Sequence, residues 1–109
     1  MTQMPTDTLG NPIPALGYVD GGAKTVALTV TSARNSTAIS ANTRVITLYA
    51  TVACYLRFGD STVTANNTDH FFPSGTYYDV AIGPDTKDRY VAAIRDGTTD
   101  GTLYISERQ

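Results

Sequence analysis

Apolar and polar residues alternate along most of the chain from Lys24 onward. Within residues 24–31, Val26, Leu28 and Val30 share one parity, and threonines occupy most of the positions between them. Successive side chains of a β-strand point to opposite faces of a sheet, so a period of two predicts a strand with one buried face. The segment is therefore expected to be a strand that turns these three side chains toward the core.

The same alternation runs without interruption from Ile46 to Phe58. This span is longer than a typical strand of about 3–10 residues. It predicts either one long strand that bends between two sheets or two strands with a break near residues 51–53.

Two shorter segments nearer the C-terminal end alternate in the same way. Residues 78–82 do so between a Ser-Gly and a Gly-Pro dipeptide, and residues 103–105 do so after the turn-rich residues 96–101. Glycine, proline, asparagine and aspartate at these junctions favour turns. Both segments are therefore expected to be strands.

Residues 85–96, which lie between these segments, fit two structures. Asp85 could cap a helix that Gly97 ends, or residues 89–95 could form another strand. We favour the strand, because the turn-rich link that follows would join it to residues 103–105 as a terminal hairpin.

The N-terminal residues 1–22 lack this alternation. Prolines and glycines interrupt the segment, and proline favours extended conformations. Its apolar side chains Leu9, Ile13, Leu16 and Tyr18 are isolated from one another. The segment is either a tail, mobile or folded back on its own domain, or an extended arm that binds a neighbouring subunit through these four side chains.

Together the segments predict an all-β fold of seven or eight short strands with no amphipathic helix. This pattern is typical of an antiparallel β-sandwich or jelly roll. A chain of 109 residues suits one domain. We therefore expect a β-sandwich domain over residues 23–109, preceded by the N-terminal arm over residues 1–22.

The composition disfavours two kinds of partner. The net charge is −2, and the eight basic residues are scattered singly, whereas nucleic-acid-binding proteins usually cluster them. No stretch approaches the roughly 20 apolar residues that span a bilayer, and no basic segment followed by an apolar one begins the chain. We therefore expect neither nucleic acid nor a membrane as a partner.

Few side chains suggest catalysis or metal binding. His70 is the only histidine and could act as a general base, while Cys54, the only cysteine, shares the parity of the apolar residues, where a thiol is usually buried and inert. Asp96, Thr98 and Asp100 resemble the start of a calcium loop, but they lack its distal glutamate and also suit a hairpin turn. We therefore expect no catalytic residue, no cofactor and no metal.

Tyrosine is the commonest aromatic residue, with seven against three phenylalanines and no tryptophan. Tyr49, Tyr55, Tyr77 and Tyr104 have the parity opposite to the apolar set, as does Arg57. Tyrosine and arginine are enriched in protein interfaces, but tyrosine is also a good strand former whose hydroxyl can stay in water. Two alternatives stay open: a partner-binding face that includes Tyr49, Tyr55 and Arg57, or ordinary solvent-exposed strand positions.

Several segments match a known arrangement in pattern and order. They are GNPIPAL at residues 10–16, TRVITLYAT at 43–51, ACYLRFG at 53–59, FPSG at 72–75 and GTLYISE at 101–107. In these segments the chain resembles a group of small β-sandwich proteins encoded in the structural modules of tailed bacteriophages.

The resemblance implies a virion component, and in particular a capsid decoration or cement protein. Such proteins place compact β domains over the joints between capsomers, often as dimers or trimers, and their terminal arms bind neighbours. The implied partners are the major capsid protein or other virion proteins, together with further copies of the chain. The implied location is the capsid surface, after synthesis in the bacterial cytoplasm. Two alternatives are a head-tail or tail-surface component and a carbohydrate-binding module whose exposed tyrosines stack on sugars.

Overall fold

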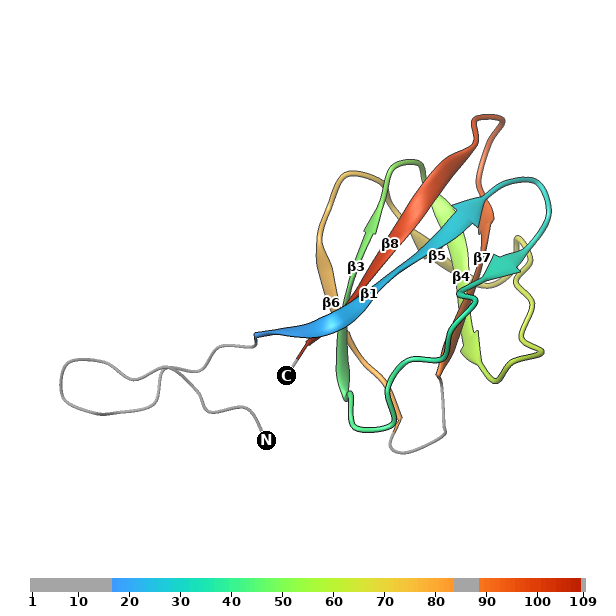
Figure 1. The fold of residues 1–109 in the computed structure, drawn as a ribbon. Coiled ribbons are helices and arrows are strands. Elements are labelled where there is room, and N and C mark those ends of the chain that lie inside the picture. Colours follow the sequence, from blue (N-terminus) through green and yellow to red (C-terminus); the bar gives the residue numbers. More distant parts are fainter. Residues whose placement is uncertain (1–16, 84–88, 109) are drawn as a thin grey trace, which may run out of the picture.

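The computed structural model describes residues 17–83 and 89–108. This part contains eight strands: β1 (Tyr18–Leu28), β2 (Ala33–Arg34), β3 (Val45–Ala50), β4 (Cys54–Gly59), β5 (His70–Phe72), β6 (Tyr78–Ala81), β7 (Tyr90–Arg95) and β8 (Gly101–Arg108). They form two four-stranded sheets, with the orders β1-β8-β3-β6 and β2-β7-β4-β5 (Figure 1). The expected all-β sandwich is confirmed.

The pairing of the strands is nested. β1 pairs with β8, β2 with β7, β3 with β6 and β4 with β5, and each pair is antiparallel. Two further antiparallel pairs, β3 with β8 and β4 with β7, complete the sheets. One long hairpin rolled into two packed sheets gives this pairing, which is the topology of a jelly roll.

The side chains of the core are those whose alternate positions in the sequence predicted burial. Its fully buried side chains come from alternate positions of both sheets, among them Val26, Leu28, Ile46, Leu48, Leu103 and Ile105 in the first and Cys54, Leu56, Val91 and Ala93 in the second. Val30 departs from the expectation, because β1 ends at Leu28 and the Val30 side chain is 70% exposed. The alternation therefore predicts which side chains are buried only for residues that belong to a strand.

The long alternating span over residues 46–58 is divided between two strands. β3 ends at Ala50, β4 begins at Cys54, and the two strands belong to different sheets. Both strands turn their even-numbered residues toward the same core, which is why the parity passes unbroken through the crossing. Of the two structures that the sequence left open, the break near residues 51–53 is observed.

The choice of a strand over residues 89–95 is confirmed, since β7 covers Tyr90–Arg95. The predicted terminal hairpin is wrong, because β7 lies in the second sheet and β8 in the first. The link between them turns at Gly97, whose φ is +83°, and carries the chain across the sandwich. Asp85, the alternative helix cap, lies outside the described residues.

The first strand starts earlier than the proposed domain boundary after residue 22. Tyr18 already pairs with Arg108 of β8, and the register then shifts before pairing resumes at Ala23. The intervening residues 19–22 interrupt the regular pairing, with Gly21 at φ +72°. Such an irregularity breaks the period of two, so the sequence pattern did not reveal the start of β1.

A buried carboxylate anchors one end of the sandwich. Glu107 of β8 is only 3% exposed and lies on the core side of the first sheet. Its oxygens accept hydrogen bonds from Lys24 Nζ at 2.6 Å, Thr43 Oγ1 at 2.6 Å and the Ser40 amide at 3.0 Å. These donors offset the cost of burying the charge and tie the β2–β3 connection to β8.

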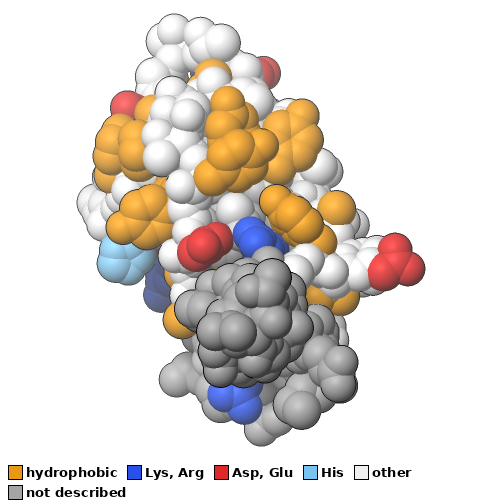
Figure 2. Space-filling view, turned by 90° about the vertical axis from the view of Figure 1, so that its left-hand side faces the viewer, with side chains coloured by type: hydrophobic (Ala, Val, Ile, Leu, Met, Phe, Trp, Pro, Cys, Tyr) orange, Lys and Arg blue, Asp and Glu red, His pale blue; other side chains and the backbone are white. Residues whose placement is uncertain are grey.

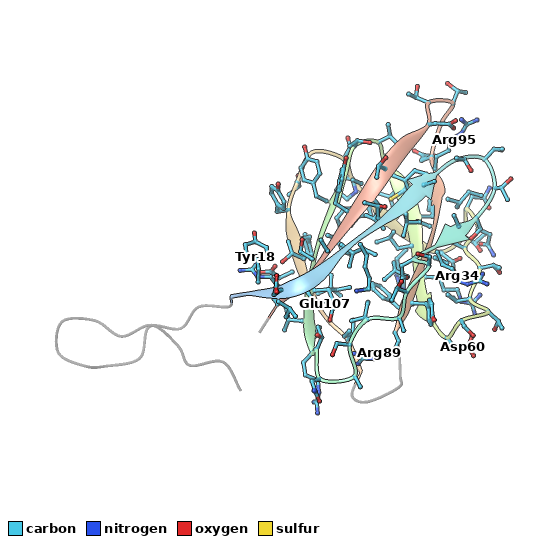
Figure 3. All side chains as sticks on the ribbon, in the orientation of Figure 1. Tyr18, Arg34, Asp60, Arg89, Arg95 and Glu107 are labelled. Carbon is cyan, nitrogen blue, oxygen red and sulfur yellow. The ribbon has the colours of Figure 1, made fainter. Side chains whose placement is uncertain are left out.

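A buried arginine holds the same connection from another side. Arg89 donates through Nη1 to the carbonyl oxygens of Ser40 at 2.5 Å and Thr43 at 2.9 Å, and through Nη2 to that of Gly83. Figure 3 shows Arg89 and Glu107 toward the same end of the sandwich, away from Arg95. The β2–β3 connection is therefore held at this end by charged side chains from two directions.

The Glu107 contacts predict an acid-sensitive fold. Burial raises the pKa of Glu107, but the hydrogen bonds from Lys24, Thr43 and the Ser40 amide outweigh burial and hold the pKa below its ordinary range. The carboxylate therefore stabilises the fold fully above the unfolded-state pKa of about 4.3, and this contribution is lost as the pH falls through the folded-state pKa. We expect the free energy of unfolding to decrease below about pH 4. Urea titrations between pH 3 and 7 should give a shallower decrease for Glu107→Gln, and equal slopes would contradict the assignment.

Candidate functional site

Exposed aromatic side chains gather on one part of the described surface. Phe71 is 56% exposed, Tyr77 72%, Tyr78 60% and Tyr104 47%. Exposed apolar side chains that cluster in this way usually mark an interaction surface. We call the surface the aromatic band and define it as Tyr55, Phe71, Tyr78, Tyr77, Tyr49 and Tyr104, which are joined at the edge of the sandwich by the ring of Phe72, itself only 6% exposed.

One part of the band crosses the outer face of the first sheet. Tyr49 of β3 lies opposite Tyr104 of β8, which lies opposite Thr25 of β1. On the other side, the Tyr49 and Tyr77 ring centroids are 4.7 Å apart. The three tyrosines therefore form a row across neighbouring strands. Figure 2 looks onto the side of the molecule where β6 lies and shows hydrophobic side chains in several groups there.

The band then continues around the edge of the sandwich. β5 and β6 are edge strands of opposite sheets, and the Phe72 and Tyr78 rings meet edge to face between them, with centroids 6.3 Å apart. On the outer face of the second sheet, Tyr55 and Phe71 make another edge-to-face contact at 5.7 Å. The rings thus connect the two outer faces.

The short link between β5 and β6 positions these rings. Its Gly75 has a φ of +78°, which side-chain-bearing residues rarely adopt, and the Gly75 amide donates a 3.0 Å hydrogen bond to the Ala50 carbonyl. The doublets Phe71-Phe72 and Tyr77-Tyr78 flank this link. The first ring of each doublet contacts a tyrosine on an outer face, Phe71 with Tyr55 and Tyr77 with Tyr49. The second rings, Phe72 and Tyr78, meet each other at the edge.

A polar cluster borders the tyrosine row on the first sheet. Thr47 Oγ1 donates a 2.5 Å hydrogen bond to Asp79 Oδ1 and accepts a 2.9 Å bond from Arg108 Nη1, which lies 3.8 Å from the same carboxylate oxygen. The Arg108 guanidinium also lies over the Tyr18 ring, 4.3 Å from its centroid. Tyrosine and arginine together are typical of contact surfaces.

The outer face of the second sheet is partly covered by its own chain. The connection between β4 and β5 reaches β2, where Arg34 Nη1 donates to the Val63 carbonyl at 3.4 Å and the Ala65 amide donates to Ser32 Oγ at 2.8 Å. Ala92, on the strand next to β2, is fully buried although it lies outside the core cluster. Figure 1 shows this connection at the right of the sandwich. The part of this face next to β2 is therefore covered, whereas Phe71 on the edge strand β5 stays exposed.

Those predicted partner-binding residues that the structure describes lie on both outer faces of the sandwich. Tyr49 and Tyr55 both belong to the aromatic band but lie on opposite outer faces, and Arg57 lies beyond Tyr55 on the second sheet. Tyr18 contacts Arg108 beside the band. The other three predicted residues, Leu9, Ile13 and Leu16, lie outside the described residues.

The sequence pattern did not identify three of these rings as part of a surface. Phe71 and Phe72 stand out in the sequence only as an apolar pair, and they lie in β5. Tyr78 belongs to the alternating residues 78–82, which were expected to form a strand, and it is 60% exposed at the start of β6. Tyr78 does have the inward parity, since it lies opposite Leu48, but it sits at the open edge of the sandwich. The signal that could have found them is the pair of aromatic doublets around a Pro-Ser-Gly turn.

The candidate catalytic side chains occupy different environments. Cys54 is fully buried, and burial raises the pKa of its thiol to about 12, so the sulfur stays protonated at neutral pH. His70 is exposed at the start of β5, where it lies opposite Leu56. Cys54 is thus enclosed in the core, whereas His70 faces solvent.

The acidic residues of the β7–β8 link have protein partners. Asp100 Oδ1 pairs with Arg95 Nη1, and Asp96 Oδ1 accepts a 3.2 Å hydrogen bond from the Tyr55 hydroxyl. Partial desolvation and this bond raise the pKa of Tyr55, which keeps the hydroxyl a donor. Within residues 17–83 and 89–108, no group of three or more His, Cys, Asp or Glu side chains could hold a metal ion. The same residues include no helix long and apolar enough to cross a membrane.

The fold and the band define a small jelly-roll domain with an exposed aromatic surface. Comparison with models of known families, with curated proteins and with solved structures gave no match to this chain. The aromatic band and the pattern of the sequence are therefore the features of this chain that bear on its function.

Proposed function

We propose that this protein is a non-enzymatic structural component of a bacteriophage virion that binds the capsid surface as a decoration or cement protein. The observation that carries the proposal is the aromatic band, in which Phe71, Tyr77, Tyr78 and Tyr104 stay exposed although their rings are large and apolar. The resemblance of the sequence to phage structural modules supplies the partner: the major capsid protein or a neighbouring virion protein.

The size of the band supports a protein partner. A fully buried aromatic side chain removes about 150–250 Å² from water, so the exposed fractions of Phe71, Tyr77, Tyr78 and Tyr104 correspond to roughly 500 Å². A surface of that size can supply the centre of a standard interface, which buries about 800 Å² on each partner. The polar cluster of Thr47, Asp79 and Arg108 beside the band suits the rim of such an interface.

A cement protein would act by mass action. Because it binds the assembled lattice and not the separated subunits, it stabilises the lattice against expansion or loss of subunits. Repeated contacts on a lattice raise the effective affinity, so each single contact can be weak. No chemistry is required of the protein, and neither a cofactor nor a metal is part of the proposal.

A carbohydrate-binding module is the second candidate. The row of Tyr77, Tyr49 and Tyr104 could stack on sugar rings, and Asp79 nearby could accept hydrogen bonds from hydroxyl groups. Jelly rolls occur in lectins as well as in viral capsids, and a fold alone does not decide a function. We rank this candidate second because sugar-stacking tryptophans are absent from the sequence.

Binding to capsids that lack the protein tests the proposal. Particles from a phage deleted for this gene are titrated with the purified chain, and the bound fraction is measured by co-sedimentation. We expect saturable binding at a fixed number of copies, weakened about tenfold or more in the double variant Tyr77→Ser, Tyr104→Ser, since interface aromatics often dominate affinity.

Val30→Ser is the matched control, because Val30 is 70% exposed and lies outside the band. This variant should bind capsids as the unaltered chain does. Absence of saturable binding, or equal weakening by the control, would reject the proposed function. Binding to a glycan array that is lost in the tyrosine variant would favour the carbohydrate-binding module instead.

A further inference from the structure

We propose that the aromatic band receives an extended segment of the capsid partner, which pairs through its backbone with the free edge of β6 and adds a fifth strand to the first sheet. The inference rests on the proposed function, since it takes the capsid protein as the partner. It adds the mode of recognition: main-chain hydrogen bonds along β6, with aromatic rings on both faces of the sheet beside them.

The backbone of β6 offers hydrogen-bonding groups to such a segment. β6 is an edge strand, and among the described residues no strand lies beyond it (Figure 1). The Ile82 amide donates a 2.9 Å hydrogen bond to the Arg44 carbonyl. Because antiparallel strands exchange hydrogen bonds at every second residue pair, Val80 also directs its amide and carbonyl to β3. Asp79 and Ala81 therefore direct theirs away from the sheet, where an incoming strand can bond to them.

The core side of β6 is also open to an added strand. Tyr78 has the inward parity, yet it is 60% exposed, because no described strand of the first sheet lies beside it to cover the ring. Val80, the next residue of the same parity, is half-buried. A strand about 4.8 Å beyond β6 would place one of its own side chains beside Tyr78. That side chain should be apolar, since the Tyr78 ring also contacts Phe72 at the margin of the core.

The other three sheet edges are less suited to pairing. β1 loses its regular register between Tyr18 and Ala23 and carries Lys24 on its core side. β2 has two residues, with the β4–β5 connection bonded to it, and β5 has three. Irregular register, inward charges and very short strands all prevent an edge from pairing. β6 keeps a regular register over its four residues, and its one charged side chain, Asp79, bonds to Thr47 on the outer face.

These contacts define the chemistry of the partner segment. Its residues on the core side lie beside Tyr78 and Val80 and should be apolar, whereas its residues on the outer side lie beside Asp79 and should be polar. At about 3.4 Å per residue, β6 is about 14 Å long, so a segment of about four or five residues in extended conformation covers it.

Proline at the free edge tests the pairing. Proline lacks an amide hydrogen, and the Ala81 amide points away from β3, so Ala81→Pro removes a donor for the incoming strand but no hydrogen bond within the sheet. Capsids that lack the protein are titrated with the unaltered chain and with this variant, and the bound fraction is measured by co-sedimentation. We expect Ala81→Pro to raise the dissociation constant about tenfold or more.

Ala27→Pro is the matched control, because Ala27 lies on β1 at the other edge of the same sheet. The Thr51 amide bonds to the Thr102 carbonyl, so Thr102 directs its backbone groups to β3. Ala27, its partner on β1, therefore directs its own amide away from the sheet. This variant should bind capsids as the unaltered chain does, and urea titrations should show that both variants are folded.

Hydrogen exchange on the unaltered chain gives a readout that needs no variant. Mass spectrometry of peptides that cover residues 77–83 should show the Asp79 and Ala81 amides exchanging rapidly in the free chain and about tenfold or more slowly on capsids. Peptides from β1 should keep their exchange rates. A contact made by the aromatic rings alone would leave the two amides exchanging as in the free chain.

Three results would overturn the inference and leave the proposed function standing: full binding by Ala81→Pro, equal weakening by Ala27→Pro, and capsid binding without protection of the two amides. Protection that appears in the free chain and rises with its concentration would assign the edge to a second copy, and would also overturn the inference. Absence of saturable capsid binding by the unaltered chain would reject the inference together with the proposed function.

Discussion

Replacing Leu48 by alanine is expected to lower the free energy of unfolding by about 2–5 kcal/mol. Leu48 is fully buried on β3, a central strand of the first sheet. Removing its side-chain atoms loses the favourable free energy of their transfer from water to the core. It also leaves a cavity that the neighbouring side chains fill only in part. Small domains have a free energy of unfolding of only about 5–15 kcal/mol, so this substitution would remove a large part of it. Urea denaturation followed by circular dichroism measures the change.

Leu56 provides the same test in the second sheet, where its side chain is 3% exposed. Val30→Ala is the matched control, because Val30 is 70% exposed and its truncation should change stability by no more than about 0.5 kcal/mol. Losses well below 1 kcal/mol at both leucines would show that the core has been assigned to the wrong side of the strands.

Removing the Glu107 carboxylate is the second large effect. Glu107→Ala should cost about 3–5 kcal/mol, because breaking a buried ion pair leaves its partner charge uncompensated. That partner is Lys24, whose side chain is only 10% exposed. The hydroxyl of Thr43 and the amide of Ser40 would also lose their acceptor. Thermal and urea unfolding at pH 7 measure the loss.

The double variant Lys24→Ala, Glu107→Ala separates the charge from the rest of the network. With both charges absent, the ammonium group of Lys24 is no longer stranded, so the double variant should be less destabilised than the sum of the two single variants. Additive costs would mean that the 2.6 Å contact between the two side chains contributes little to stability.

The parity of the sequence predicted the core but could not predict how strands pair. Val26, Leu48 and Leu103 were all placed on buried faces, and they are buried. The alternation says which side of a strand is apolar, and this is equally true whether the next strand lies in the same sheet or in the opposite one. For that reason residues 46–58 gave no clear sign of a crossing, and β7 and β8 were wrongly joined as a hairpin.

The candidate site was predicted only in part for a related reason. Tyr49, Tyr77 and Tyr104 were correctly placed opposite the apolar set, and the structure brings them together in one row. Tyr55 has the same parity but belongs to the other sheet, a difference that parity cannot detect. The ring contact between Phe72 and Tyr78 depends on two strand edges meeting, which is a property of the topology and not of any local pattern.

The nested pairing of the strands also determines when each pair of strands can form during synthesis of the chain. β8 lies between β1 and β3, so the first sheet has no continuous hydrogen-bonded centre until residues 101–108 have been synthesised. β1 therefore emerges from the ribosome long before the strand that pairs with it. Folds dominated by such distant pairings form slowly, because the chain must lose the entropy of closing large loops before stabilising contacts can form. During that interval β1 and β3 expose apolar faces that nascent-chain chaperones can bind.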